Sequence, residues 1–176
     1  MTQVTTGTAT ATNNGTRLST VRPCLTFSDR AEEAINFYVS LFSDSRVVNV
    51  MRSDGTGPLP AGTLLHATFE LGGQEYTAFD GGPSFSFSEG FSMVVTCETQ
   101  VEIDEIWAQL TADGGKDGPC GWLKDRFGVS WQVVPAALGR MMGDSTSGNP
   151  GRMMQALLKM HKLDIAALEQ AYRGGS

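Results

Sequence analysis

Residues 118–135, GPCGWLKDRFGVSWQVVP, decide how this chain folds. Alternating residues predict short strands over 122–124 and 129–134, and the turn between them predicts positive φ at Gly128. Two interpretations are open at this point. The stretch is either an active site with Cys120 as nucleophile, or the closing corner of a folded sheet.

The surroundings of Cys120 favour the second interpretation. A catalytic thiol needs a nearby base or positive charge to lower its pKa. Lys124 and Arg126 are close in sequence, but Asp125 opposes them and no histidine is local. We therefore expect the charged residues to form a solvated turn and Cys120 to be a small buried or pocket-lining thiol.

Residues 21–80 predict a β-α-β-β-β unit. A helix is expected over 30–42, capped by Ser28 or by Asp29 with Glu32 as a capping box. Gly72 and Gly73 form a two-residue hairpin turn. The four expected strands cover residues 21–27, 46–52, 63–71 and 74–79.

The same order begins again after residue 80. A strand is expected over 91–96, and Thr99 with Glu102 forms a capping box that opens a second helix. The helix starts lie about 70 residues apart, which indicates an internal repeat with an abbreviated second copy. Residues 118–135 then supply the last hairpin of this copy.

The whole chain therefore divides into four parts. The Thr-rich first part has almost no large apolar residue and is expected to be disordered. The last part is expected to be a hairpin of helices, with Asp164 capping the final one. The parts are a tail over 1–20, a first module over 21–80, a second module over 81–135 and a helical extension over 136–176.

Composition restricts the possible partners. The net charge is −6 and the pI is about 4.8, so nucleic acids and anionic membranes are poor candidates. The three cysteines are widely spaced and form no CxxC pair, which argues against a zinc knuckle and for reduced thiols in the cytoplasm. No apolar run approaches the roughly 20 residues of a membrane span.

The runs PCLTFSDRAEEAINFYVSLF, GPSFSFSEGFSMVV and GPCGWLKDRFGVSWQVVP resemble the vicinal oxygen chelate superfamily, which has the glyoxalase, bleomycin-resistance and extradiol-dioxygenase fold. They are most similar to its PhnB-like branch, often labelled 3-demethylubiquinone-9 3-methyltransferase-like. The resemblance implies an α+β fold in which two βαβββ modules form a curled mixed sheet around a pocket, usually in a homodimer.

The resemblance also implies where a divalent metal would be bound in related enzymes. Those positions fall on Pro23, on Thr77 or Ala78, on Ser92 and on Gln132. Only Gln132 is a conceivable ligand, so we expect no metal and no other cofactor. S-adenosylmethionine chemistry is not expected either, because no glycine-rich turn joins a strand to a helix.

His66 is the only histidine within the expected sheets. It shares a strand face with Thr68 and Glu70, and it is either a general base or a structural histidine. Trp131 lies on the face opposite Gln132. Because the resemblance implies that Gln132 faces the pocket, we expect Trp131 to point toward a helix. His66 and Cys120 are the candidate catalytic residues, and the expected ligand-binding residues are Cys24, Thr26, His66, Phe79, Trp122 and Gln132.

Together these features predict a protein that binds a small apolar or aromatic molecule between its modules, without a metal and with an unknown reaction. One alternative is a metal-dependent lyase, isomerase or dioxygenase of the same superfamily. Another is a non-catalytic sequestering protein of the resistance type. The sequence leaves open whether the chain is an enzyme.

Overall fold

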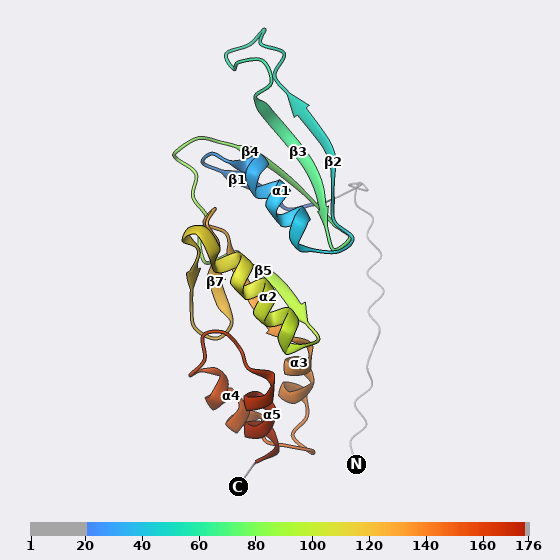
Figure 1. The fold of residues 1–176 in the computed structure, drawn as a ribbon, viewed down its shortest axis with the longest axis vertical. Coiled ribbons are helices and arrows are strands. Elements are labelled where there is room, and N and C mark those ends of the chain that lie inside the picture. Colours follow the sequence, from blue (N-terminus) through green and yellow to red (C-terminus); the bar gives the residue numbers. More distant parts are fainter. Residues whose placement is uncertain (1–20, 175–176) are drawn as a thin grey trace, which may run out of the picture.

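The computed structural model describes residues 21–174, which form two four-stranded mixed sheets and five α-helices (Figure 1). The predicted α+β fold with repeated βαβββ topology is confirmed. The prediction of a disordered tail over residues 1–20 lies outside the described residues.

The first sheet has the strand order β1-β4-β3-β2. Its strand β1 runs parallel to β4, and the other neighbours are antiparallel. Helix α1 covers one face, because apolar residues recur along it at helical spacing and along the strands at alternate positions. The elements are β1 (Cys24–Phe27), α1 (Ala31–Leu41), β2 (Arg46–Arg52), β3 (Leu64–Leu71) and β4 (Gln74–Asp80).

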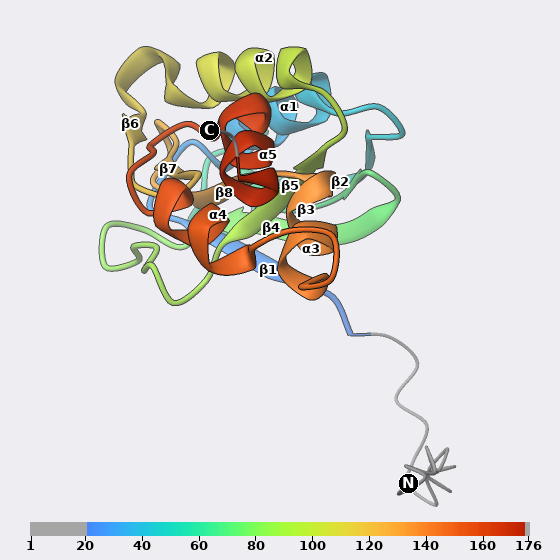
Figure 2. The same ribbon diagram turned by 90° about the horizontal axis from the view of Figure 1, so that it is seen from below.

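The second sheet repeats this arrangement as β5-β8-β7-β6, with β5 parallel to β8. Helix α2 packs on it as α1 packs on the first sheet, and Figure 2 shows both helices on the same side of the strands. The elements are β5 (Met93–Cys97), α2 (Gln100–Thr111), a 3-10 turn η1 (Ala112–Gly114), β6 (Lys116–Asp117), β7 (Trp122–Lys124) and β8 (Ser130–Pro135). Strand β6 was not predicted from the sequence.

One hydrophobic core joins the two modules. Trp131 on β8 is 1% exposed, and its ring packs against α1 and the residue after it. The ring centroids lie 5.3 Å from Tyr38 and 5.7 Å from Phe42. Trp131 therefore points toward a helix, as the resemblance implies, and that helix belongs to the other module.

Three helices follow the second sheet instead of a simple two-helix hairpin: α3 (Ala136–Gly143), α4 (Pro150–Leu157) and α5 (Ile165–Arg173). They surround a small apolar cluster of their own. The backbone N–H groups of Cys120 and Gly121 donate to the carbonyls of Met160 and His161, both at 2.7 Å. These bonds fasten the helices to the turn before β7.

Two of the three predicted helix caps are confirmed. Thr99 and Glu102 form the reciprocal capping box of α2, and Asp164 caps α5. The predicted cap of α1 is wrong: its N-cap is Arg30, in a left-handed conformation and without a side-chain cap. Asp80, at the end of β4, accepts from the N–H of Ala31 at 2.8 Å instead.

The predicted strand boundaries err by up to three residues. Strand β1 begins at Cys24, because Val21 is 91% exposed and contributes nothing to the buried face. Strand β5 is shifted toward the C-terminus and ends at Cys97. The hairpin of β3 and β4 is as predicted, with positive φ at Gly72 and Gly73.

Candidate functional site

Asp125, in the closing hairpin, is buried and only 4% exposed. Its carboxylate accepts hydrogen bonds from the Tyr38 hydroxyl at 2.6 Å and the Trp131 indole N–H at 2.8 Å. It also accepts from the backbone N–H groups of Phe127 at 2.9 Å and Val129 at 3.0 Å. The prediction of a solvated charge cluster is therefore wrong for Asp125, because its own hairpin supplies three donors and Tyr38 of the other module supplies the fourth.

The Tyr38 hydroxyl, which donates to Asp125, stays protonated. Burial, then the charge of Asp125 and the hydrogen bond to it, raise the pKa of Tyr38 well above its usual value. Tyr38 therefore remains a donor across the ordinary pH range. This pair is a structural contact between modules and is unsuited to exchange protons with a substrate.

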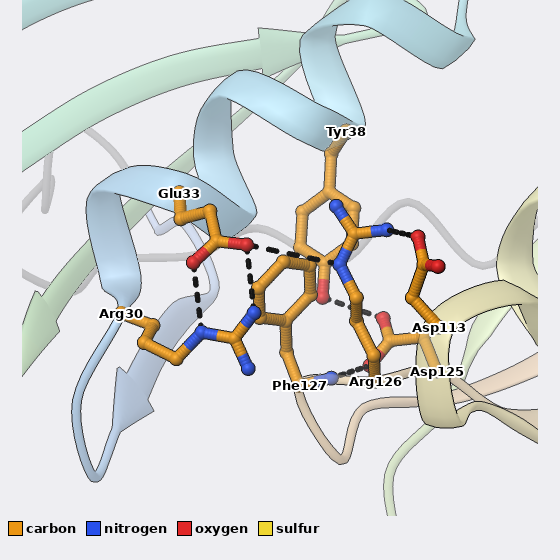
Figure 3. A network of polar contacts seen from close by, with 7 residues as sticks. All are labelled: Arg30, Glu33, Tyr38, Asp113, Asp125, Arg126 and Phe127. Carbon is orange, nitrogen blue, oxygen red and sulfur yellow. Dashed lines mark hydrogen bonds and ion pairs between the residues drawn. The ribbon is translucent and has the colours of Figure 1, made fainter.

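Arg126 covers this buried group from outside, with 17% of its side chain exposed. Its guanidinium lies 4.1 Å from the ring centroid of Phe37 and 4.9 Å from that of Phe127. Figure 3 shows it between Asp113 at 3.2 Å and Glu33 at 3.8 Å. Arg126 is thus occupied by cation–π contacts and ion pairs within the chain.

Cys120 has positive φ and is half-buried against the cluster of C-terminal helices. The backbone of His161 lies next to the turn at Cys120, a proximity that the sequence could not show. The imidazole of His161, however, is engaged elsewhere, because its Nδ1 atom lies 2.7 Å from a carboxylate oxygen of Asp117. The structure gives Cys120 a packing contact and shows no base directed at its thiol among the described residues.

The open face of the first sheet brings four of the six expected ligand-binding residues together. Cys24 and Thr26 on β1 alternate with buried residues that face α1, and Thr26 pairs in register with Phe79 on β4. His66 lies on the same face of β3. This face combines an aromatic ring, a hydroxyl, a thiol and an imidazole.

The other two expected residues are register partners on the open face of the second sheet, Trp122 on β7 and Gln132 on β8. The Gln132 side chain donates to the Ser92 hydroxyl at 2.9 Å. Within a single chain the six residues therefore lie in two groups, one on each sheet.

The positions that the resemblance relates to metal ligands lie close together in pairs. The Pro23 carbonyl accepts from the Thr77 N–H at 2.9 Å, and Gln132 contacts Ser92. Their side chains offer only hydroxyl and amide groups. In residues 21–174 no three His, Cys, Asp or Glu side chains converge. This donor set does not fit the charged oxygen shell that a hard divalent cation prefers.

A groove of about 560 Å³ does lie between the modules, but on the helical side. None of the six expected ligand-binding residues lines it. Its walls come from the end of α1, the β3–β4 hairpin, β5 and α2. Sequence reasoning missed it because its walls meet only when the two modules pack together.

The chain matches a family model described as "3-demethylubiquinone-9 3-methyltransferase" over residues 19–134. This match ends before α3. No curated protein shows significant similarity to the chain. Within the described residues no helix is long and apolar enough to cross a bilayer.

Several solved structures are similar to this chain. A putative 3-demethylubiquinone-9 3-methyltransferase, PhnB protein, from Bacillus cereus is 41% identical, with a TM-score of 0.60, covering 66% of this chain and 98% of its own. Protein PA1353 from Pseudomonas aeruginosa is 23% identical, with a TM-score of 0.53, covering 65% and 96%. The fosfomycin resistance protein FosX from Mesorhizobium loti is 12% identical, with a TM-score of 0.50, covering 72% and 98%. The last two show the fold alone.

Proposed function

Because the chain belongs to the 3-demethylubiquinone-9 3-methyltransferase family, in the PhnB-like branch of the vicinal oxygen chelate superfamily, we propose that it binds a small apolar or aromatic molecule on the open faces of its sheets. The observation that carries the proposal is the shared face of Cys24, Thr26, His66 and Phe79. Trp122 and Gln132 supply a second aromatic and polar pair.

A homodimer would bring these two groups into one site. Met51, the register partner of His66, is 55% exposed, and Val94, the register partner of Gln132, is 59% exposed. Apolar residues that are exposed beside candidate ligand contacts mark a surface whose burial lowers the free energy of the protein. We therefore propose that a second copy of the chain covers the open faces and encloses the ligand.

The proposed binding does not use a metal. Gln132 stands where the resemblance places a carboxylate in related metalloenzymes, and it is engaged with Ser92. A neutral amide and a hydroxyl suit the orientation of a polar group on a ligand better than they suit a divalent cation. A metal-dependent lyase, isomerase or dioxygenase is the competing proposal.

Native mass spectrometry of freshly purified protein, recorded before extensive dialysis, tests the binding proposal. We expect a retained small molecule whose occupancy falls in Trp122→Ala and Phe79→Ala but stays unchanged in Val101→Ala, a change at an exposed residue of α2. Equal occupancy in all three variants would contradict the proposed site. Recovery of the same molecule unaltered after prolonged incubation would support sequestering rather than catalysis.

Elemental analysis of the same material tests the absence of a metal. We expect no stoichiometric Ni, Zn, Fe or Mn in the wild-type protein. A stoichiometric metal that disappears in His66→Ala or Gln132→Ala would overturn the metal-independent proposal and support the competing one.

A further inference from the structure

The groove on the helical side of the molecule has an apolar floor. Nine apolar side chains contribute to it, including aromatic rings from both modules. Its volume of about 560 Å³ lies within the range of sites for drug-sized molecules, roughly 300–1,000 Å³. The nine are Leu41, Phe42, Leu71, Tyr76, Met93, Val94, Val95, Ile106 and Trp131.

One wall of the groove is acidic. Glu102, Glu105 and Gln109 line it from one side of α2, as their spacing requires, and Glu98 adds a further carboxylate just before that helix begins. No Lys or Arg is among the groove-lining residues within the described part of the chain. The charge of this wall is therefore not balanced within the groove.

The three glutamates are not equivalent. Glu102 is engaged in the capping box, where its carboxylate accepts from the N–H groups of Glu98 and Thr99 at 2.7 and 2.9 Å. The positive end of the helix dipole partly offsets its charge. This leaves the carboxylates of Glu98 and Glu105 as the groups available to an incoming cation.

A further feature suits a positively charged group. Strand β5 is an edge strand of its sheet, and edge strands present backbone carbonyls that can accept hydrogen bonds. An ammonium group could use both acceptors and negative charge.

We propose that this groove, which borders the open face of the second sheet at Val94, is a second ligand site and binds an organic cation whose amine faces Glu98 and Glu105 and whose apolar body lies on the floor. Charge complementarity selects the cation, and the aromatic rings of Phe42 and Tyr76 add a surface suited to an aromatic body. A purely apolar ligand would leave the acidic wall unused, and an anion would be repelled by it.

Three probes that share an indole ring separate charge from shape: tryptamine is cationic at neutral pH, tryptophol is neutral and indole-3-acetate is anionic. Calorimetry and amide chemical-shift mapping on the full chain should show tryptamine binding most tightly, with shifts in β5 and α2. Binding should weaken as ionic strength rises. Equal affinity for tryptamine and tryptophol, or shifts confined to the open faces, would overturn the proposal.

The double variant Glu98→Gln/Glu105→Gln should weaken tryptamine binding by about tenfold and leave tryptophol unaffected. The matched control is Glu89→Gln/Glu169→Gln, which changes the net charge equally at residues outside the groove. Gln109→Lys places a positive charge at an exposed groove position with little risk to folding and should also weaken binding. Unchanged affinity in both groove variants would overturn the proposal, as would an equal loss in the control.

Discussion

In the first sheet, strands β2, β3 and β4 have seven, eight and seven residues, whereas β6, β7 and β8 of the second sheet have two, three and six. The strand order is nevertheless the same in both. Shorter strands provide fewer ladder hydrogen bonds and bury less apolar surface, so the second module needs stabilisation from elsewhere. The structure shows two sources of it.

One source is the carboxylate of Asp125, which collects donors from its own hairpin and from α1 of the first module. The other is the C-terminal helices, which are fastened to the turn at Cys120 and Gly121. The first module shows neither device in the described residues. The difference between the two modules therefore gives residues 118–135, GPCGWLKDRFGVSWQVVP, a structural role in holding the second module together.

The largest expected effect comes from breaking the first source. Asp125→Ala leaves three buried donors and one partly buried donor without their acceptor, so we expect a loss of about 3–5 kcal/mol in the free energy of unfolding by urea. Tyr38→Phe removes one donor and leaves the carboxylate three, so it should cost only about 1–2 kcal/mol. A loss for Asp125→Ala no larger than that for Tyr38→Phe would show that the carboxylate does not organise the hairpin.

Asp125 also shows where prediction from sequence stops. Its burial depends on Tyr38, which lies 87 positions away in the chain, so no local pattern could show it. The missed cap of α1 has the same cause, because its acceptor Asp80 lies 49 positions from Ala31. By contrast, the capping box of α2 was predicted correctly because its two residues are three positions apart.

The candidate ligand residues follow the same rule. Alternation within single strands correctly places Gln132 opposite Trp131 and places His66 on the face with Thr68. It cannot show how the two sheets sit relative to each other. For that reason the ligand pocket between the modules stays a prediction, and the groove beside α2 was not predicted.

The second source of stabilisation can be tested by comparing two glycines with positive φ, Gly72 in the first module and Gly121 in the second. A Cβ on Gly121 would lie 2.8 Å from the Val133 carbonyl oxygen, whereas one on Gly72 would meet nothing within 4 Å. We expect Gly72→Ala to cost about 1 kcal/mol from backbone strain alone, and Gly121→Ala about 2–4 kcal/mol.

Hydrogen exchange sharpens this test. Gly121→Ala should raise exchange in α4 and α5, since the N–H of Gly121 donates to the carbonyl of His161. Gly72→Ala should leave exchange in those helices unchanged. Equal costs for the two variants, with no change in α4 and α5, would mean that the C-terminal helices do not support the second sheet.

The smallest expected effect is a difference in reactivity between the cysteines on the first strands of the two modules. Folding at neutral pH stays unchanged. Cys24 on β1 is exposed, whereas Cys97 on β5 is 4% exposed and has a pKa raised to about 11. Because alkylation requires the thiolate, iodoacetamide at mildly alkaline pH should modify Cys24 and leave Cys97 intact. Peptide mass spectrometry after limited reaction times measures both rates.

The pH dependence of the same reaction shows whether Cys97 reacts slowly because its pKa is raised or because the reagent reaches it slowly. The pKa of Cys97 is higher in the native state than in the unfolded chain, where a thiol has a pKa of about 8.5. This contribution to stability is present below that pH and declines as the pH rises toward 11. Modification of Cys97 should therefore increase only over that range, and rapid modification at neutral pH would show that β5 opens more readily than its buried face implies.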